Sequence, residues 1–486
     1  MLSRDREDGR DTGQPQGVGS EAYLNGTSQG PTPEDARKDG HIRGRSKSFM
    51  KCRGLLSTPR DECSIICSMK VIILIIYLFF FSVSLGLKWL NIRYLKEKGD
   101  QVPAEFSTAI DAETLRKTIS YTAESIRLST VLSLLNNLVV IVFLFGGFIT
   151  IYDGWVTSLS KSFVVRGVFF VLGLMYVGTI FSIPFSLYKN FNIENRYGFN
   201  TMTGRLWLSD LLKSTVISTV LSTLLVAAAL FLVRFSPEWW WLWVWAVFLL
   251  FSIFLMYISP YVLEPLFFKF EPVQTEGLEA EIRALVEKVG IKVKNIFQVD
   301  ASRRSLHSNA YFSGIGRVKR IVLFDTLLES MTHREILAVL AHEVGHWKKK
   351  HVMKRIILTE IVALGAIFLA YKLLGWEGLP GIIGLEQGSF YVRVFILGFL
   401  SSLLLFPLTP ALSLLSRKHE WQADKFACEL TGRPLDLAEA LIKLSKENLA
   451  NLHPHPLYAA FYYSHPPVVE RVRRLQGKAT AAAGDS

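Results

Sequence analysis

The sequence predicts a mostly α-helical integral membrane protein with a smaller α+β domain outside the membrane. Half of its 486 residues are apolar, and the mean hydropathy of +0.29 exceeds that of a typical soluble protein. The apolar residues form long uninterrupted runs instead of the periodic patterns of soluble domains. Two long polar stretches, one before the last two runs and one after them, are predicted to form the second domain.

Seven runs are long enough to cross a bilayer, since a spanning helix needs about 20 apolar residues. Five tryptophans between residues 239 and 245 stand at the turn between the fourth and fifth runs, as an interfacial aromatic belt would. We expect the spans near residues 71–91, 131–152, 164–187, 215–234, 239–262, 355–374 and 392–415.

These runs divide the chain into five parts. Residues 1–68 are rich in Gly, Ser, Asp, Arg and Pro and are predicted to be disordered. Met69 stands directly before the first run and is a second candidate for the start of translation. The other parts are a membrane domain with spans one to five (69–262), a soluble insert (263–353), spans six and seven (354–415) and a C-terminal segment (416–486).

The distribution of charge predicts the orientation in the membrane. The net charge is +12, and no nucleic-acid-binding motif accompanies it, so we expect membrane lipid and not nucleic acid as the partner of the basic surface. The loops after spans one, three and five and the C-terminal segment are rich in Lys and Arg, whereas the opposite loops carry only Lys161, Arg166 and Arg234. The positive-inside rule therefore places the insert and the C-terminal segment in the cytosol, although the basic stretch before Lys70 opposes this orientation.

The soluble insert has its own pattern of elements. Residues 275–290 read as an amphipathic helix closed by Gly290, and residues 294–300 read as a strand. Residues 307–313 and 317–325 flank a Gly-Ile-Gly turn, which predicts a β-hairpin.

A metal-binding motif follows the hairpin. Thr332 and Glu335 form a capping box that begins a helix. On this helix His342 and His346 are four residues apart, so both imidazoles project from one face, with Glu343 beside the first. A chance match to His-Glu-x-x-His in this chain has a probability on the order of 0.01. The competing interpretation is a pair of surface histidines on a basic helix.

A catalytic zinc site usually has three protein ligands, so a third is expected from another element. Glu420 and Asp424, just after span seven, share one helix face. Glu420 can supply the third ligand, while Asp424 can hold a ligand histidine through its other ring nitrogen. Taken alone, this pair fits a solvated acidic face equally well. His419 is a rival ligand, but it points about 100 degrees away from Glu420.

Several stretches, in order along the chain, resemble the type I CAAX prenyl proteases, which are integral-membrane zinc metalloendopeptidases. Their order matches the family and makes the resemblance more specific than the zinc motif by itself. The stretches are Ile258-Ser259-Pro260-Tyr261, Glu271-Pro272, His307-Ser308-Asn309-Ala310-Tyr311-Phe312, His342-Glu343-Val344-Gly345-His346-Trp347, residues 416–427, Tyr463-Ser464-His465-Pro466-Pro467 and Glu470-Arg471.

The resemblance implies a barrel of seven helices around a water-filled chamber, capped on the cytosolic side by a zincin-like metalloprotease domain. It implies cleavage of peptide or protein substrates near a C-terminal CAAX motif, with prenylated substrates in eukaryotic members. Carried onto this sequence, it implies one Zn²⁺ per chain on His342, His346 and Glu420, activation of water with Glu343 as the base, Asp424 as the acid behind the ligands, His465 and Arg471 near the substrate carbonyl, and Asn309, Ala310 and Tyr311 as the substrate-binding strand.

The sequence departs from the eukaryotic pattern in two places. It does not finish with a dilysine signal, and residues 451–457 resemble bacterial members. These features favour a bacterial inner membrane over the endoplasmic reticulum membrane. A quality-control metalloprotease with no prenyl requirement is therefore an alternative function. An alternative outside the enzymes is a transporter with a vestigial zinc site. Glu360, inside span six, receives no role.

Overall fold

The computed structural model describes residues 59–313 and 319–484, nearly all of which belong to one compact unit, Glu62–Ser486. Within this unit, the described residues contain seven helices long and apolar enough to cross a membrane, as the sequence predicts. Most of their apolar side chains face outward, with at most 22% of any apolar window buried, so lipid is their natural surroundings. The spans are Ser68–Lys98, Ala112–Phe145, Phe163–Glu194, Gly204–Phe235, Trp240–Phe267, His351–Leu374 and Phe390–Thr431.

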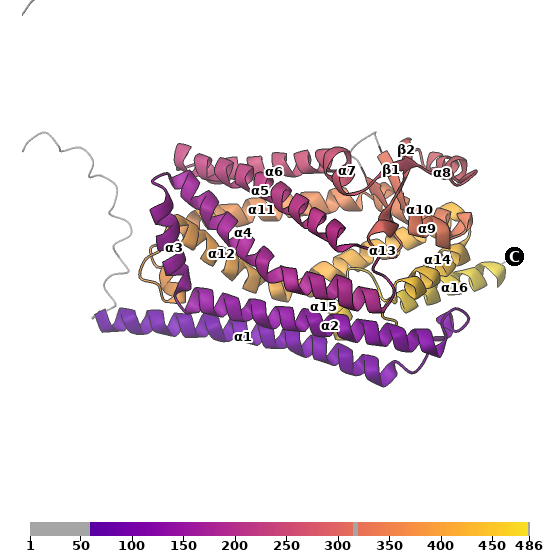
Figure 1. Cartoon of the computed structure of the whole chain (residues 1–486), viewed down its shortest axis with the longest axis horizontal. Helices are drawn as coiled ribbons and strands as arrows, with labels where there is room; N and C mark the ends of the chain where they lie inside the picture. The colour runs from indigo at the N-terminus through magenta and orange to yellow at the C-terminus, as the bar shows by residue number, and fades with distance from the viewer. Residues whose placement is uncertain (1–58, 314–318, 485–486) are drawn as a thin grey trace, which may run out of the picture. The chain divides into compact units, whose positions relative to one another are not determined.

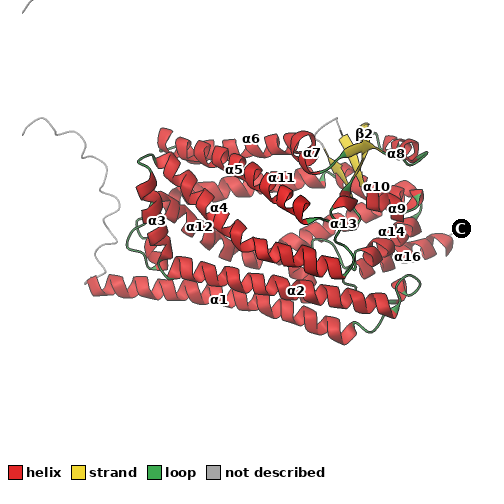
Figure 2. Ribbon diagram, in the orientation of Figure 1, coloured by secondary structure: helices red, strands yellow, loops and turns green. Residues whose placement is uncertain are grey.

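Helices predominate throughout the described chain (Figures 1 and 2). The long membrane helices are α1 (Pro59–Lys98), α2 (Ala112–Val140), α4 (Phe163–Tyr188), α5 (Gly204–Phe235), α6 (Trp240–Ile258), α11 (His351–Leu374), α12 (Phe390–Leu405) and α13 (Thr409–Thr431). The other helices are α3 (Phe148–Leu159), α7 (Glu264–Phe267), α8 (Leu278–Glu287), α9 (Asp325–Ser330), α10 (His333–Lys348), α14 (Pro434–Glu447), α15 (Pro456–Tyr462) and α16 (Val468–Gly484).

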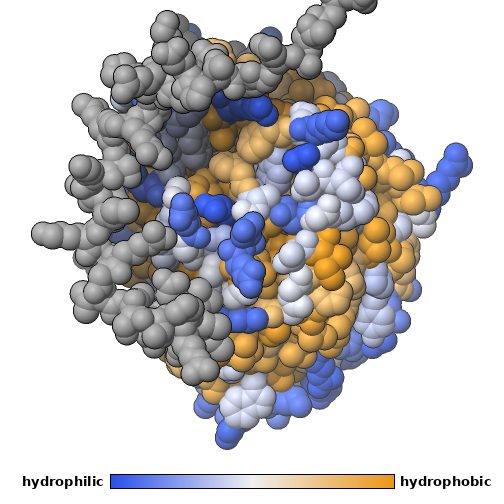
Figure 3. Space-filling model, turned by 90° about the vertical axis from the view of Figure 1, so that its left-hand side faces the viewer, coloured by the Kyte–Doolittle hydropathy of each residue, from blue (hydrophilic) through white to orange (hydrophobic). Residues whose placement is uncertain are grey.

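Neighbouring membrane helices follow one another in a closed ring. Contacts join α4 to α5, α5 to α6, α6 to α11 and α11 to α12. Phe399 of α12 packs on Tyr77 of α1, and Lys88 of α1 donates to Ser133 of α2 at 2.9 Å. Arg196, just after span three, pairs with Glu124 of α2. This ring is the arrangement that the resemblance implied, whereas the water-filled chamber stays an expectation. Figure 3 shows the end of the ring at α3, where a group of hydrophilic side chains near the middle lies next to a broad apolar surface.

Three predicted boundaries were wrong. Helix α1 begins at Pro59, so the last part of the segment predicted to be disordered is helical, while residues 1–58 lie outside the described residues. Proline suits the first turn of a helix, where no backbone donor is needed. The stretch between the first two predicted spans, residues 92–130, is mostly helical, because α1 continues to Lys98 and α2 begins at Ala112 with Asp111 as its cap. The second span ends at Phe145, since two glycines separate it from α3.

The soluble part carries a four-stranded sheet with the order β1-β2-β4-β3. The hairpin prediction is confirmed, because β3 and β4 pair antiparallel, although its Gly-Ile-Gly turn lies outside the described residues. Strand β2 lies one residue ahead of its predicted range and pairs with β4 in parallel. β3 occupies one edge of this sheet. The strands are β1 (Phe270–Pro272), β2 (Val293–Val299), β3 (Ala310–Ser313) and β4 (Lys319–Phe324).

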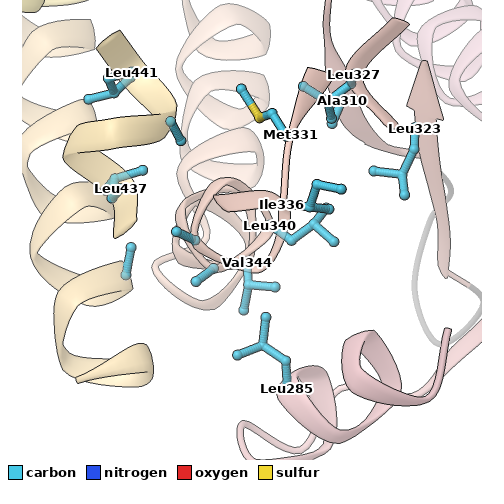
Figure 4. Packing of buried hydrophobic residues seen from close by; sticks show 14 of the residues in the cluster. Leu285, Ala310, Leu323, Leu327, Met331, Ile336, Leu340, Val344, Leu437 and Leu441 are labelled. Atoms are coloured by element: carbon cyan, nitrogen blue, oxygen red, sulfur yellow. The ribbon is translucent and has the colours of Figure 1, made fainter. Parts of the chain in front are cut away.

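A single large apolar core holds α10 in place. Its members come from the sheet, α8, α10, α14 and α16. In Figure 4, Ile336, Leu340 and Val344 of α10 lie between Leu323 of β4 on one side and Leu437 of α14 on the other. Ile336, Leu340 and Val344 are all at most 1% exposed. Their spacing puts one face of α10 in the core and leaves another for the metal-binding motif.

Candidate metal centre

Helix α10 begins at the capping box that the sequence predicted. The backbone N–H of Thr332 donates to Glu335 Oε2 at 2.8 Å, and the N–H of Glu335 donates back to Thr332 Oγ1 at 3.4 Å. Lys443 of α14 donates to the same Glu335 oxygen at 2.7 Å. The cap therefore fixes both the start of α10 and its position against α14.

The second half of the motif lies where α10 crosses α13. Gly345 permits this crossing, because a Cβ on it would lie 3.0 Å from the Cα of Ala423 and 3.2 Å from its carbonyl oxygen. Ala423 itself is fully buried. The close approach of the two backbones brings Glu420 and Asp424 of α13 up to the histidines of α10.

The structure brings His342, His346 and Glu420 together, as predicted. Their candidate ligand atoms all lie within 4.8 Å of one another. The two Nε2 atoms are 3.2 Å apart, and each lies 3.3 Å from a Glu420 carboxylate oxygen. His342 and Glu420 are buried, with exposed fractions of 7% and 4%.

This group of atoms fits a metal cation. Glu420 Oε2 is buried and lies 3.3 Å from His342 Nε2 and 2.8 Å from His465 Nδ1. A buried carboxylate is costly unless positive charge compensates it. Two imidazoles and one carboxylate are a common ligand set for catalytic zinc. Burial by itself would lower the pKa of His342, but its hydrogen bonds to Asp424 and Glu420 raise that pKa to about 9. The site therefore favours positive charge.

Asp424 lies behind His342, as expected, and Arg471 of α16 joins it. His342 Nδ1 is 2.8 Å from Asp424 Oδ1. Arg471 donates two hydrogen bonds to the Asp424 carboxylate, at 2.9 and 2.6 Å. All three residues are at most 8% exposed. The Arg471 guanidinium also lies 3.9 Å from Glu420 Oε2 through Nη1, so it faces the ligand cluster as well as Asp424. Its expected position near a substrate carbonyl stays a prediction.

The other two residues expected to act in catalysis are more exposed than His342 and Glu420. His465 Nδ1 is 2.8 Å from Glu420 Oε2, and the His465 side chain is 62% exposed. Glu343 is half-buried on α10, next to His342. Both can therefore be reached from outside the ligand cluster.

The expected substrate strand lies on the edge strand β3. Asn309 precedes the strand and is exposed, and its carbonyl accepts a hydrogen bond from Phe324 of β4. Ala310 is buried in the main core. Tyr311 donates to Glu264 of α7 at 2.9 Å. The side chains of Ala310 and Tyr311 are thus held by the protein, whereas Asn309 is exposed at the start of the edge strand.

Two residues next to the ligands, His351 and Gln422, were not predicted from the sequence. His351, the first residue of α11, lies with its Nδ1 3.1 Å from Nδ1 of His346, and its Nε2 lies 2.8 Å from Gln422 Oε1. His419, the rival ligand, stacks on His351 with ring centroids 4.2 Å apart and is not part of the metal cluster. The available signal was His351 itself, five residues after His346, but a continuous helix would have pointed it elsewhere.

Two family models match this chain. The model described as the CAAX prenyl protease N-terminal region, with five membrane helices, matches residues 91–269. The model of peptidase family M48 matches residues 272–479 and so includes the whole candidate metal centre.

Individual relatives agree with these matches. A CAAX prenyl protease 1 homolog of Arabidopsis thaliana is 39% identical over 319 residues, which cover 64% of this chain and 73% of the relative. CAAX prenyl protease 1 of Saccharomyces cerevisiae is 34% identical over 412 residues, covering 79% and 90%. The crystal structure of S. mikatae Ste24p superimposes with a TM-score of 0.76 at 30% identity, covering 86% of this chain and 99% of that one.

Proposed function

This chain belongs to the CAAX prenyl protease family of M48 membrane metallopeptidases, and on that premise we propose that it cleaves CAAX-type substrates with one zinc ion held by His342, His346 and Glu420. The observation that carries the proposal is the convergence of two imidazole nitrogens and a buried carboxylate oxygen within 4.8 Å of one another. This donor set matches zinc. Zinc in such a site supplies a Lewis acid that lowers the pKa of water and polarises the scissile carbonyl.

The side chains around the ligands then have distinct roles. We assign to Glu343 the role of general base, which takes a proton from the attacking water and delivers it to the leaving amine. His465 is exposed beside Glu420 and can donate a hydrogen bond to the developing oxyanion. Arg471 pairs with Asp424, and its guanidinium also lies 3.9 Å from Glu420 Oε2, beside the place that we propose for the substrate carbonyl. Asp424 in turn orients His342 through Nδ1.

We propose that the substrate adds as a further strand along β3, next to residues 309–311. β3 is the edge of the described sheet, and an edge strand offers unpaired backbone groups to an extended peptide. Main-chain pairing depends little on the substrate's side chains. Cleavage should therefore tolerate variation in sequence, and the prenyl group would supply much of the selectivity.

The membrane setting supports the same substrate class. The protein is a multi-pass membrane protein, and a prenylated peptide partitions into the same bilayer. We propose that the active site faces the cytosol, on the basis of the Lys and Arg distribution. The relatives from Arabidopsis and yeast are eukaryotic CAAX prenyl proteases. A quality-control protease without a prenyl requirement is therefore not favoured, while the bacterial inner membrane stays a prediction.

The first test is Glu343→Gln in the purified full-length protein. The substitution keeps the size of the side chain but removes the base, so we expect zinc content to remain near one per chain. We expect cleavage of a farnesylated CAAX peptide, followed by mass spectrometry, to fall about 10²–10⁴-fold. The wild-type protein should cleave the farnesylated peptide faster than its unprenylated twin and lose activity with a zinc chelator.

Two results would contradict the proposal. Retained cleavage by the Glu343→Gln variant would remove Glu343 from the mechanism. Equal rates for the farnesylated peptide and its twin would remove the prenyl group from substrate recognition.

A further inference from the structure

The two histidine ligands are held from behind by chemically different partners. Both direct Nε2 toward Glu420, so both turn Nδ1 away from the metal position. His342 Nδ1 meets the Asp424 carboxylate, which in turn is paired with Arg471. His346 Nδ1 instead meets an imidazole, that of His351, at 3.1 Å.

The direction of the hydrogen bonds behind His346 follows from the chemistry of the groups. Gln422 Oε1 only accepts, so His351 Nε2, 2.8 Å away, carries the proton of that bond. A neutral His351 then has a lone pair on Nδ1, which accepts the Nδ1–H of His346. This arrangement leaves a lone pair on His346 Nε2, the atom beside Glu420. The opposite direction would protonate His346 Nε2 and prevent ligation, so metal binding itself selects the direction described.

His351 is fixed firmly enough to act in this way. Its side chain is buried, with 4% exposed, and it stacks nearly parallel on His419, with 10° between the ring planes. The preceding residue, Lys350, has a φ of 57°. This left-handed conformation is unfavourable for a residue with a Cβ, and it ends α10 so that α11 begins with His351 turned toward His346.

We propose that His351 and Gln422 are positioning residues that hold His346 in its metal-binding tautomer and orientation. The inference rests on the proposed zinc site. His346 is then held by a neutral imidazole–amide pair, whereas His342 is held by a carboxylate. Because His351 is the first residue of span six and Gln422 lies on the helix of span seven, the pair also ties one ligand to the cytosolic ends of two membrane helices.

Two variants of His351 separate hydrogen bonding from packing. His351→Leu fills the space but cannot accept from His346, and we expect zinc affinity to fall roughly 10–100-fold, as is usual when a partner of a ligand is lost. His351→Asn can place its amide oxygen where Nδ1 stood, so most of the affinity should return. His333→Leu, at the start of the same α10, is the control for removing a histidine and should bind zinc like the wild type.

Gln422 provides an independent series. Gln422→Glu keeps an acceptor and should retain zinc at least as well as the wild type. Gln422→Met removes the acceptor at similar volume and should weaken binding. Gln422→Lys places a donor next to His351 Nε2, so the proton of a neutral His351 moves to Nδ1. His351 can then no longer accept from His346, and this variant should weaken binding most.

The measurement is zinc transfer from the full-length protein to a competing chelator, with thermal unfolding of the metal-free protein recorded alongside. Equal losses in His351→Leu and His351→Asn, or no ordering among the three Gln422 variants, would overturn the inference. A wild-type protein that holds no zinc would instead overturn the proposed function. Unchanged unfolding of the metal-free variants, together with the expected order, would exclude a general loss of structure.

Discussion

Asp424 and Arg471 form a pair whose contribution differs for metal binding and for folding. The carboxylate orients His342, whereas the arginine compensates the carboxylate through two hydrogen bonds. Both groups are buried. Each is therefore costly to leave without the other.

At the residue scale, we predict that Asp424→Ala impairs both properties. Zinc affinity should fall about 10–100-fold, because His342 loses its partner. The free energy of unfolding should fall by about 3–5 kcal/mol, because the Arg471 charge stays buried without compensation. Zinc transfer to a chelator and denaturation of the metal-free protein measure the two effects.

The double variant Asp424→Ala with Arg471→Leu is the matched control. It removes the uncompensated charge, so stability should recover in part while zinc affinity stays low. Recovery of both together, or of neither, would show that the pair does not act in the way described.

At the scale of helices, the crossing of α10 and α13 sets the site. Glu420 reaches the histidines only because Gly345 lets the α13 backbone approach closely at Ala423. The metal-binding group is therefore a property of the packing of two helices as much as of its three ligands.

We expect Gly345→Ala to destabilise the protein by about 1–3 kcal/mol through overpacking. The added methyl group meets backbone atoms, which cannot rotate away, so the helices must separate and zinc affinity should drop with stability. Gly345→Val should be worse. Thermal unfolding and zinc content check both variants.

Gly477→Ala in α16 is the control for the loss of glycine in a helix. A Cβ there meets nothing within 4 Å, so this substitution should be neutral or stabilising by up to about 1 kcal/mol. If Gly345→Ala behaved in the same way as Gly477→Ala, the close crossing would not be required for the site.

Features of the site with local causes could be predicted from the sequence, whereas those with tertiary causes could not. The capping box at Thr332 and the spacing of His342 and His346 are local, so they were found directly. Glu420 was found through its helix spacing to Asp424 and through the resemblance. His351 was missed because its position depends on a left-handed residue, Lys350, within a run of lysines that gives no signal for a helix break.

The membrane helices show the same limit. Apolar runs predicted all seven spans, but not the polar first half of α2. This half is helical because Leu115, Thr118, Ala123 and Ile126 are buried there. Such burial by other parts of the fold leaves only a weak periodic signal in the chain.

At the scale of the whole molecule, His307 connects the membrane helices to the catalytic part. It lies just before β3, stacks on Phe199, and has its ring nitrogens 3.3 Å from Glu194 Oε2 at the end of span three and 2.8 Å from Asn448 Oδ1 after α14. Burial by itself would lower the pKa of His307, but Glu194 and Asn448 outweigh it and raise the pKa above its ordinary value. Protonated His307 therefore stabilises the fold.

This raised pKa predicts a pH dependence of stability. The contribution of His307 is fully present below its unfolded pKa of about 6.5 and is lost as the pH rises through the higher folded pKa. His307→Gln keeps a polar side chain without the charge. The gap in unfolding temperature between the wild type and this variant should be widest at acidic pH and shrink toward alkaline pH. A gap that stayed constant across this range would contradict the assignment.

The positions of the two ends of the helix ring lead to a prediction of membrane orientation. The connection between α3 and α4 contains the exposed Lys161, whereas α14 of the catalytic part ends near the exposed Lys446. An odd number of spans separates these positions, because spans three to seven lie between them. They must therefore face opposite sides of the membrane, and the excess of Lys and Arg predicts that Lys446 faces the cytosol.

Single cysteines test this orientation in a background in which the four native cysteines are replaced by serine. On intact cells or sealed vesicles with the cytosolic side inside, a membrane-impermeant maleimide should label Lys161→Cys at once and Lys446→Cys only after the membrane is opened. The reverse order would place the metal centre outside the cytosol, where newly prenylated chains are not made, and would separate the proposed substrate from the enzyme. Labelling of both positions before opening would indicate leaky vesicles, which a soluble cytosolic marker protein detects, so the two orders of labelling decide the orientation.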